Sequence, residues 1–293
     1  ARPGNRSVMA TQQTLDIMQV RYGERAGTSL QAIDYGESVA INGVEVRMAP
    51  AGHILGAAQV IVDWKGYRAV ISGDYKRAAD PTCAGFEVIK CDLFITEATF
   101  GLPVFVHENA GTEAARLVAS LAASRHRTHL LGVYGLGKCQ RMISLVRSAG
   151  YLRPIYLHGA LQGLCDYYTS QGIELGELRS VADEPPETLQ GQLVLCPPSA
   201  IADRWSRRMN DPLTAFASGW MRVRARARQR GAEFPIIVSD HADWPALLQT
   251  IAEVEAGEIW VTHGREDALL HQISNMGLKG RALALVGFED EGE

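Results

Sequence analysis

Residues 235–277 read PIIVSDHADWPALLQTIAEVEAGEIWVTHGREDALLHQISNMG, and this stretch decides the fold class. The short apolar runs at 235–238 and 259–262 predict strands because turn residues bound them. Residues 244–255 and 266–276 predict helices. A proline in the first turn of one and a glycine after the other are typical of helix ends. Strand and helix alternate, so we predict an α/β fold.

The rest of the chain supports the same class. Apolar periodicity predicts further helices at 11–22, 112–123 and 138–149. Further strands are predicted at 38–48 around an Asn-Gly hairpin signal, 59–63, 68–71, 93–96, 155–157 and 193–195. From residue 155 to residue 234 the apolar runs are shorter, and two proline pairs interrupt them. This layout suggests one domain inserted into another.

Composition excludes several classes of protein. The 293 residues are 46% hydrophobic and 21% charged, with a formal net charge of −4, which indicates a globular chain rather than a disordered or fibrous one. There is no apolar run of about 18 residues and no leader-like pattern, so we expect a soluble cytoplasmic protein with no membrane partner. The five cysteines show no CxxC spacing, which favours reduced thiols over disulfides or cysteine-bound zinc.

Positive charge is concentrated in residues 204–230, which contain eight arginines, no lysine and one acid, a local balance of +7. Guanidinium groups match phosphate oxygens, so the segment is a candidate nucleic-acid interface, with a solvated basic face as the alternative. Arg222, Arg224, Arg226 and Arg228 recur at every second residue. An extended segment would place all four on one face.

Ionisable side chains follow the predicted strands. Asp74, Glu97, the pair Asp240-His241, and His263 each come within three residues of the end of an apolar run. In open α/β sheets, ligands bind outside the carboxyl ends of the strands, where side chains distant in sequence meet. We therefore expect these residues to share one site.

These side chains are of the types that bind a metal ion. His53 lies between Gly52 and Gly56, where little can shield its imidazole. Together with Asp74 and His263 it offers the three protein ligands that a catalytic zinc or manganese ion needs. For each residue alone, a turn, a helix cap or a satisfied polar group is the stronger explanation, and no HxxxH or HExxH motif indicates a metal. The metal hypothesis depends on their joint appearance at strand ends.

Five stretches resemble, in order, the motifs of the β-CASP nucleases of the metallo-β-lactamase superfamily. They are GHILGAAQ (52–59), SGDYKR (72–77), TEATFG (96–101), SDHAD (239–243) and VTHG (261–264). The stretches YGLGKCQR (134–141) and SGWM (218–221), with Trp244, resemble more specifically the bacterial ligase-associated DNA exonucleases. The resemblance spans essentially the whole chain.

The resemblance implies a metallo-β-lactamase αβ/βα sandwich with an inserted β-CASP α/β domain. The first part of the sandwich would be residues 1–110, the insertion 111–234 and the last part 235–293. Two divalent ions, zinc or manganese, would bind at the interface between the domains. His53 would ligate one, Asp74 would bridge both and His263 would ligate the second.

The resemblance also implies hydrolysis of phosphodiester bonds. His241 would protonate the leaving oxygen, with Glu97 orienting its imidazole and Asp240 as a possible substitute. Lys138, Arg141 and the arginine segment would grip the strand. The ligase-associated resemblance favours a DNA exonuclease in repair over RNA processing, and association with an ATP-dependent DNA ligase and a helicase.

One family feature is absent from this sequence. Members carry an HxHxDH signature ahead of a stretch that resembles residues 1–4, and no such signature occurs here. We therefore expect an N-terminally truncated chain whose metal site is incomplete and which is inactive by itself. Two other hypotheses stay open: a non-catalytic nucleic-acid-binding module, and a small-molecule hydrolase, such as a lactamase or thioesterase, in which the arginines have no role.

Overall fold

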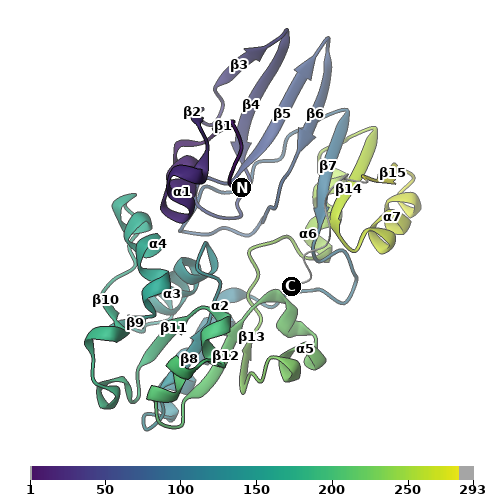
Figure 1. Ribbon diagram of the computed structural model, residues 1–293. Helices are drawn as coiled ribbons and strands as arrows, with labels where there is room; N and C mark the ends of the chain where they lie inside the picture. The colour runs from purple at the N-terminus through teal and green to yellow at the C-terminus, as the bar shows by residue number, and fades with distance from the viewer. Residues whose placement is uncertain (1, 284–293) are drawn as a thin grey trace.

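The computed structural model describes residues 2–283, which form two units that are each built around their own sheet (Figure 1). The first unit combines the N-terminal part of the chain with its last helices and strands. The second unit is formed by the residues between them. The chain is therefore mixed α/β with an insertion, as the alternation of elements predicts.

The first unit contains a seven-stranded sheet in the order β15-β14-β7-β6-β5-β4-β3. Its strands are β3 (Ser38–Ile41), β4 (Val44–Pro50), β5 (Ala58–Trp64), β6 (Tyr67–Ile71), β7 (Leu93–Ala98), β14 (Glu258–Gly264) and β15 (Lys279–Ala282). Strands β3 to β6 pair antiparallel, and β6, β7, β14 and β15 pair parallel. Asn42 and Gly43 both adopt positive φ in the β3–β4 turn, as a two-residue hairpin requires.

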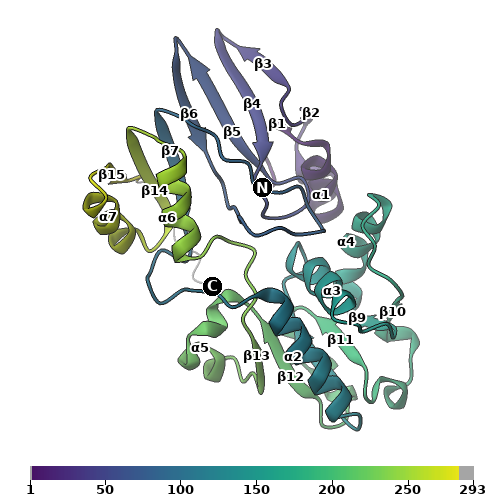
Figure 2. The ribbon, with the colours of Figure 1, turned by 180° about the vertical axis from the view of Figure 1, so that it is seen from behind.

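Two helices pack against this sheet, α6 (Trp244–Glu253) and α7 (Glu266–Asn275). Near the N-terminus, α1 (Gln12–Tyr22) packs instead against a small parallel sheet that joins β1 (Ser7–Ala10) to β2 (Ser29–Ala32). Figure 2 shows α6 in front of β7 and β14. Leu247 and Ile251 of α6 are buried in one core cluster with Phe94 and Ile259 of these strands. Burial of this apolar face holds α6, and hence the loop before it, in place.

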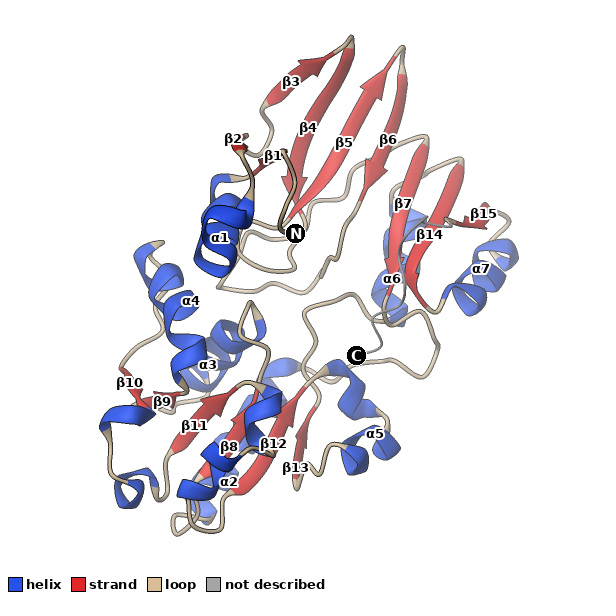
Figure 3. Cartoon of the chain, viewed as in Figure 1, coloured by secondary structure: helices blue, strands red, loops and turns tan. Residues whose placement is uncertain are grey.

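The second unit contains a six-stranded sheet in the order β10-β9-β11-β8-β12-β13, with every pairing parallel. Its strands are β8 (His129–Gly132), β9 (Ile155–Leu157), β10 (Leu178–Ser180), β11 (Leu193–Cys196), β12 (Leu213–Ala217) and β13 (Phe234–Ile236). Its helices are α2 (Ala110–Ala123), α3 (Lys138–Ser148), α4 (Gly159–Ser170) and α5 (Arg224–Gln229). Figure 3 shows β8 and β11 inside this sheet, with strands on both sides of them. Both are buried throughout, as expected of strands in a parallel sheet.

The structure corrects the predicted position of the second domain boundary. Strand β13 pairs with β12, so residues 235 and 236 belong to the sheet of the second unit rather than to the last part of the sandwich. A short apolar run carries no information about which sheet it joins, because strand pairing is non-local. The chain returns to the first unit only after β13.

The arginine segment is helical rather than extended, the conformation that would have placed its four arginines on one face. Residues 224–229 form helix α5, and Arg222 ends the preceding turn, Gly219–Arg222. Arginine and alanine are both strong helix formers, and Ala227 is buried beside Phe216 and Met221. Because helical positions two apart lie on different faces, the four arginines do not form one strip.

Two further features concern the molecule as a whole. Tyr167 of α4 donates a hydrogen bond to Asp16 of α1 at 2.9 Å, which joins the two units away from their sheets. Over residues 2–283, no helix combines the length and the apolar character needed to cross a membrane.

Candidate active site

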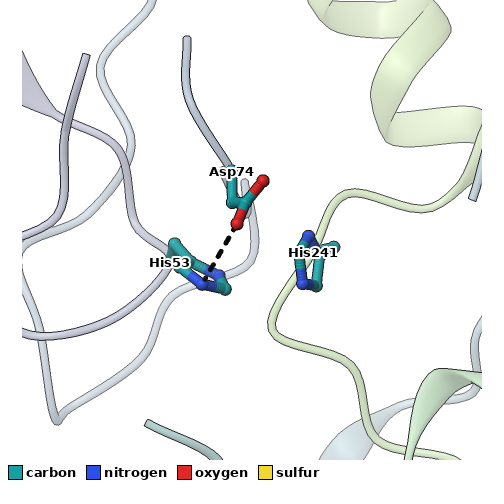
Figure 4. Close-up of side chains that lie close together, drawn as sticks. All are labelled: His53, Asp74 and His241. Carbon is teal, nitrogen blue, oxygen red and sulfur yellow. Dashed lines mark ion pairs between the residues drawn. The ribbon is translucent and has the colours of Figure 1, made fainter. Parts of the chain in front are cut away.

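Three side chains from three separate segments point toward one another between the two units (Figure 4). His53 follows β4, Asp74 follows β6, and His241 lies between β13 and α6. One potential ligand atom from each lies within 4.8 Å of the others. His53 Nε2 is 3.8 Å from Asp74 Oδ2, and the two imidazole centroids are 4.7 Å apart. We call these three residues the cluster.

The backbone fixes the orientation of His53. Its Nδ1 lies 2.9 Å from the carbonyl oxygen of Asp240, which can only accept a hydrogen bond. Nδ1 therefore carries the proton, and Nε2 is left with a lone pair that faces Asp74. Burial lowers the pKa of His53, and the neighbouring His241 lowers it further, so the neutral ligand form is favoured. Gly52 makes the position possible, because a side chain there would collide with the carbonyl oxygen of Lys76.

Glu97 fixes His241. This carboxylate lies near the end of β7, is only 2% exposed, and accepts hydrogen bonds from His241 Nδ1 at 3.0 Å and from the Tyr75 backbone N–H at 2.8 Å. Burial disfavours a charged imidazole, but the charge and hydrogen bond of Glu97 outweigh it and raise the pKa of His241 to about 9. His241 is therefore protonated at neutral pH, and its Nε2 presents a proton to the cluster.

Asp74 lies partly exposed, with 43% of its side-chain surface accessible. Partial burial alone would raise its pKa, but the interactions with His241, His53 and His263 lower it below the ordinary value. His263 thus lies close enough to act on Asp74. It is exposed at the end of β14, where the pairing with β7 shifts, and its φ of 58° is unusual for a residue other than glycine.

The predicted ligand set is therefore only partly assembled. The structure brings His53 and Asp74 within reach of one cation, but His241 rather than His263 is the third member of the cluster. The pairing of β14 with β7 shifts between Thr262 and Gly264, at His263 itself. A strand end marks the region of a side chain in a sequence, but a bulge changes its direction.

Asp240 was expected as a possible substitute for Glu97 in orienting His241, but its carboxylate does not contact that imidazole. Its carboxylate accepts instead from Lys138 at 3.1 Å and Arg141 at 3.2 Å. Arg141 also contacts Asp80 at 3.3 Å, and Asp80 contacts Lys76 at 2.6 Å. These five residues form a buried ion network that joins the two units. Although burial alone would raise it, the pKa of Asp240 falls to about 2 beside the two cations, and burial lowers that of Lys138 to about 8.

The network is where the structure places Lys138 and Arg141. The two residues are only 4% and 6% exposed, so they offer little surface to a strand of nucleic acid. They fasten the chain instead: Lys138 Nζ donates to the Val238 carbonyl at 2.8 Å, and Arg141 donates to the Ser239 carbonyl. The expected contact surface in α3 is thus an internal brace for the site.

His241 and Ala242, which follow in the chain, are bound to the first unit. His241 is bound to Glu97, and the Ala242 N–H donates to the Tyr75 carbonyl at 2.6 Å. The peptide between Asp240 and His241 is therefore where the anchorage changes from the second unit to the first. Both units together determine where the imidazole of His241 points.

The predicted arginines take separate positions. Arg222 pairs with Glu108 at 3.4 Å, while Arg224 and Arg228 are exposed. Arg226 alone of the four lines a cavity, together with Arg230. The sequence patterns predicted no role for Lys76 or Asp80. Lys76 lies in the SGDYKR motif, whereas Asp80 lies in an irregular loop and carries no sequence signal.

Several known proteins are similar to this chain, although no family model matches it. The chain is 30% identical over 251 residues to a "Probable DNA ligase" of Opitutus terrae, which covers 81% of the chain and 23% of that protein. It is 30% identical over 120 residues to "Endoribonuclease YSH1" of Gibberella zeae, which covers 40% of the chain and 14% of that protein. It is also 29% identical over 152 residues to "Cleavage and polyadenylation specificity factor subunit 3" of Dictyostelium discoideum, which covers 48% and 19%.

The chain spans less than a quarter of the length of each of these relatives. Among solved structures, a protein of unknown function from Enterococcus faecalis V583 superposes with a TM-score of 0.62 at 12% identity. It covers 96% of this chain and 74% of that one. This likeness concerns the fold alone.

Proposed function

The chain belongs to the β-CASP nuclease branch of the metallo-β-lactamase superfamily, and from this premise we propose that it carries the core of a divalent-metal-dependent phosphodiesterase that acts on nucleic acid. In this proposal the first unit is the metallo-β-lactamase part and the second unit is the β-CASP insertion. The observation that carries the proposal is the cluster, in which an oriented imidazole, an ionised carboxylate and a protonated imidazole converge.

The donor set fits a divalent cation. His53 Nε2 and the Asp74 carboxylate are the nitrogen and oxygen ligands that zinc and manganese accept, and His263 is near enough to influence Asp74. A metal bound there supplies charge neutralisation for the phosphate and activation of water. The part of the chain described by the structure offers fewer ligands than a two-metal site needs, so a second ion requires further ligands.

His241 is the proton donor in this proposal. Its Nδ1 is committed to Glu97, so Nε2 is the atom that faces the cluster. A pKa near 9 keeps a proton on that atom at neutral pH, which suits transfer to a leaving oxygen better than metal binding. Glu97 acts as a positioning residue, because it holds the tautomer and the direction of the ring.

We propose DNA as the preferred substrate and exonucleolytic repair, together with a ligase and a helicase in the cytoplasm, as the setting. Support comes from the Opitutus terrae relative, which matches over 251 residues and bears the name of a DNA ligase. RNA is the alternative, because the other relatives are named as an endoribonuclease and a cleavage and polyadenylation factor.

The substitution Asp74→Ala tests the metal-dependent activity in the protein that contains this chain. We expect metal content to fall and hydrolysis of single-stranded DNA and RNA to drop by about 100-fold or more, since removal of a central catalytic group has effects of that order. Asp34→Ala, an exposed carboxylate in the same unit, is the matched control. If Asp74→Ala leaves metal content and rate unchanged, the metal role is wrong.

The same assay separates the other hypotheses. A non-catalytic module predicts binding of single strands that weakens with salt, without cleavage in added manganese or zinc. A small-molecule hydrolase predicts turnover of an ester or lactam that is insensitive to salt.

A further inference from the structure

The second unit contains a cavity of about 340 Å³ beside the cluster. Its lining is aromatic and basic: Tyr134, Phe216, Ser218, Trp220, Met221, Arg226, Gln229 and Arg230. The volume lies in the range of small-ligand sites, at its lower end. The cavity is therefore large enough for part of a ligand rather than for a solvent molecule alone.

The topology places this cavity where parallel sheets bind ligands. Strands β8 and β12 are adjacent and parallel, and Tyr134 and Ser218 follow their carboxyl ends. This edge is the preferred ligand position in open α/β sheets. The cavity is thus built by the fold and does not depend on one surface loop.

Charge indicates which ligand fits. The lining includes two arginines and no carboxylate, and neither Arg226 nor Arg230 forms an ion pair with an acid among residues 2–283. The Arg226 guanidinium lies 4.1 Å from the centroid of Trp220, and that of Arg230 lies 5.6 Å from Phe216. Aromatic faces hold these guanidinium groups in position, and their charges are left for an anion.

Planar surfaces indicate the rest of the ligand. Tyr134 is 40% exposed and stands edge-on to Phe216 at a centroid distance of 6.4 Å. Its ring and the guanidinium plane of Arg226 are the two kinds of surface on which unpaired bases stack. A planar ring with a phosphate attached therefore satisfies both the shape and the charge of the cavity.

One aromatic ring, that of Phe100, lies between the cavity-lining Trp220 and His241 of the cluster. The Phe100 ring lies 4.9 Å from Trp220 and 6.1 Å from His241, measured between centroids. The turn Gly219–Arg222 packs directly on Phe100, since a side chain at Gly219 would come within 2.5 Å of that ring. A strand that occupies the cavity thus passes the cluster within a few nucleotides.

We propose that this cavity is a nucleotide subsite that binds one unpaired base and its phosphate from a single-stranded substrate. The base stacks on Tyr134 and Arg226, and Arg230 pairs with the phosphate. The inference rests on the proposed action on nucleic acid and specifies how the strand is held. Double-stranded ends do not fit, because their bases are stacked and paired.

The test is strand binding in EDTA, so that no metal and no cleavage are involved. A fluorescein-labelled oligothymidylate of about 10 nucleotides is titrated with the protein, and affinity is read from anisotropy. The double variant Arg226→Gln/Arg230→Gln is expected to bind about tenfold more weakly. The matched control Arg224→Gln/Arg228→Gln removes the same charge from exposed positions of α5 that do not line the cavity and is expected to lose no more than about threefold.

A second set of measurements distinguishes the contribution of the base to binding from that of the phosphate. An abasic strand of equal length is expected to bind the unmodified protein about tenfold more weakly, and Tyr134→Leu is expected to weaken the oligothymidylate but not the abasic strand. Trp220 is left intact because it packs against Phe100 and Phe105.

Three results would overturn the subsite: equal losses in the two arginine pairs, no loss in either, or equal affinity for the abasic strand. A protein that binds as expected in EDTA but never cleaves would contradict the proposed catalysis and leave the subsite standing. If the protein cleaves nucleic acid but the Arg226→Gln/Arg230→Gln variant binds the strand as well as the unmodified protein, the subsite is contradicted and the proposed catalysis stands.

Discussion

In α3, Lys138 and Arg141 lie against Asp240 and Asp80 and are almost fully buried, whereas in α5 Arg226 lines an open cavity that has no carboxylate. The sequence analysis assigned residues of both helices to nucleic-acid binding, those of α3 through the family resemblance and those of α5 through their charge. The difference lies in the acids that the fold brings beside them. A buried cation must be paired, so it braces the structure, whereas a cation without an acid remains available to a ligand.

The largest expected effect is on the stability contributed by α3. Arg141→Met removes the cation between Asp80 and Asp240 and leaves two buried carboxylates without it. We expect the free energy of unfolding, measured by urea denaturation, to fall by about 3–5 kcal/mol. Arg224→Met, at an exposed position of α5, should change it by no more than about 0.5 kcal/mol. Similar losses in the two variants would remove the distinction between the helices.

A second comparison concerns two buried carboxylates, Glu97 and Asp240. Glu97→Gln removes the charge that raises the pKa of His241, so this pKa should fall from about 9 toward its ordinary value. Because a general acid must be protonated, the alkaline limb of the pH–rate profile should move to lower pH, with a rate loss of about 100-fold.

Asp240→Asn is the control for that profile. Its carboxylate pairs with Lys138 and Arg141, so the alkaline limb should move much less than in Glu97→Gln. If Glu97→Gln leaves the limb where it is, the carboxylate does not set the protonation of His241.

The network also predicts a smaller, pH-dependent effect. The folded-state pKa of Asp240 is about 2, below the ordinary 3.8. A depressed carboxyl pKa stabilises the folded state above about pH 4, and this contribution is lost as the pH falls toward about 2. It amounts to about 2 kcal/mol. Unfolding free energies measured from about pH 5 to pH 2 should therefore fall less steeply in Asp240→Asn than in the unmodified protein. Parallel curves would contradict the ion pairing.

The smallest change in stability belongs to the cavity. Arg226→Gln should alter the free energy of unfolding by no more than about 0.5 kcal/mol, since no buried acid depends on this side chain. It should nevertheless lower the salt dependence of strand binding by about one unit of slope in a plot of log affinity against log salt. Arg228→Gln serves as the control, and an equal change in its slope would argue against a specific contact.

Local signals in the sequence predict most of the elements. The Asn42-Gly43 turn lies between β3 and β4 as predicted, and helices α1, α2, α3, α6 and α7 begin or end within a few residues of their predicted limits. These predictions depend on periodicity, caps and turn residues, all of which are properties of neighbouring positions.

The failures concern long-range partners. Nothing in residues 235–238 indicates pairing with β12, and the two-residue arginine period fits a strand as well as the helix that Ala227 anchors. In the site, the strand-end rule finds Asp74, Glu97 and His241, and the glycines on either side of His53 indicate that residue. It does not predict the shift that sets His263 apart, or that Asp80 lies beside Arg141.

The crossing of the chain between the two sheets has a mechanical consequence. Val238, Ser239 and Asp240 are fastened to α3, and His241 is fastened to Glu97, so one peptide bond, between Asp240 and His241, links the two anchorages. The direction of the imidazole beside Asp74 therefore depends on contacts from both units. A substitution that loosens either anchorage is expected to disturb it, even when the substituted residue lies far from the imidazole itself.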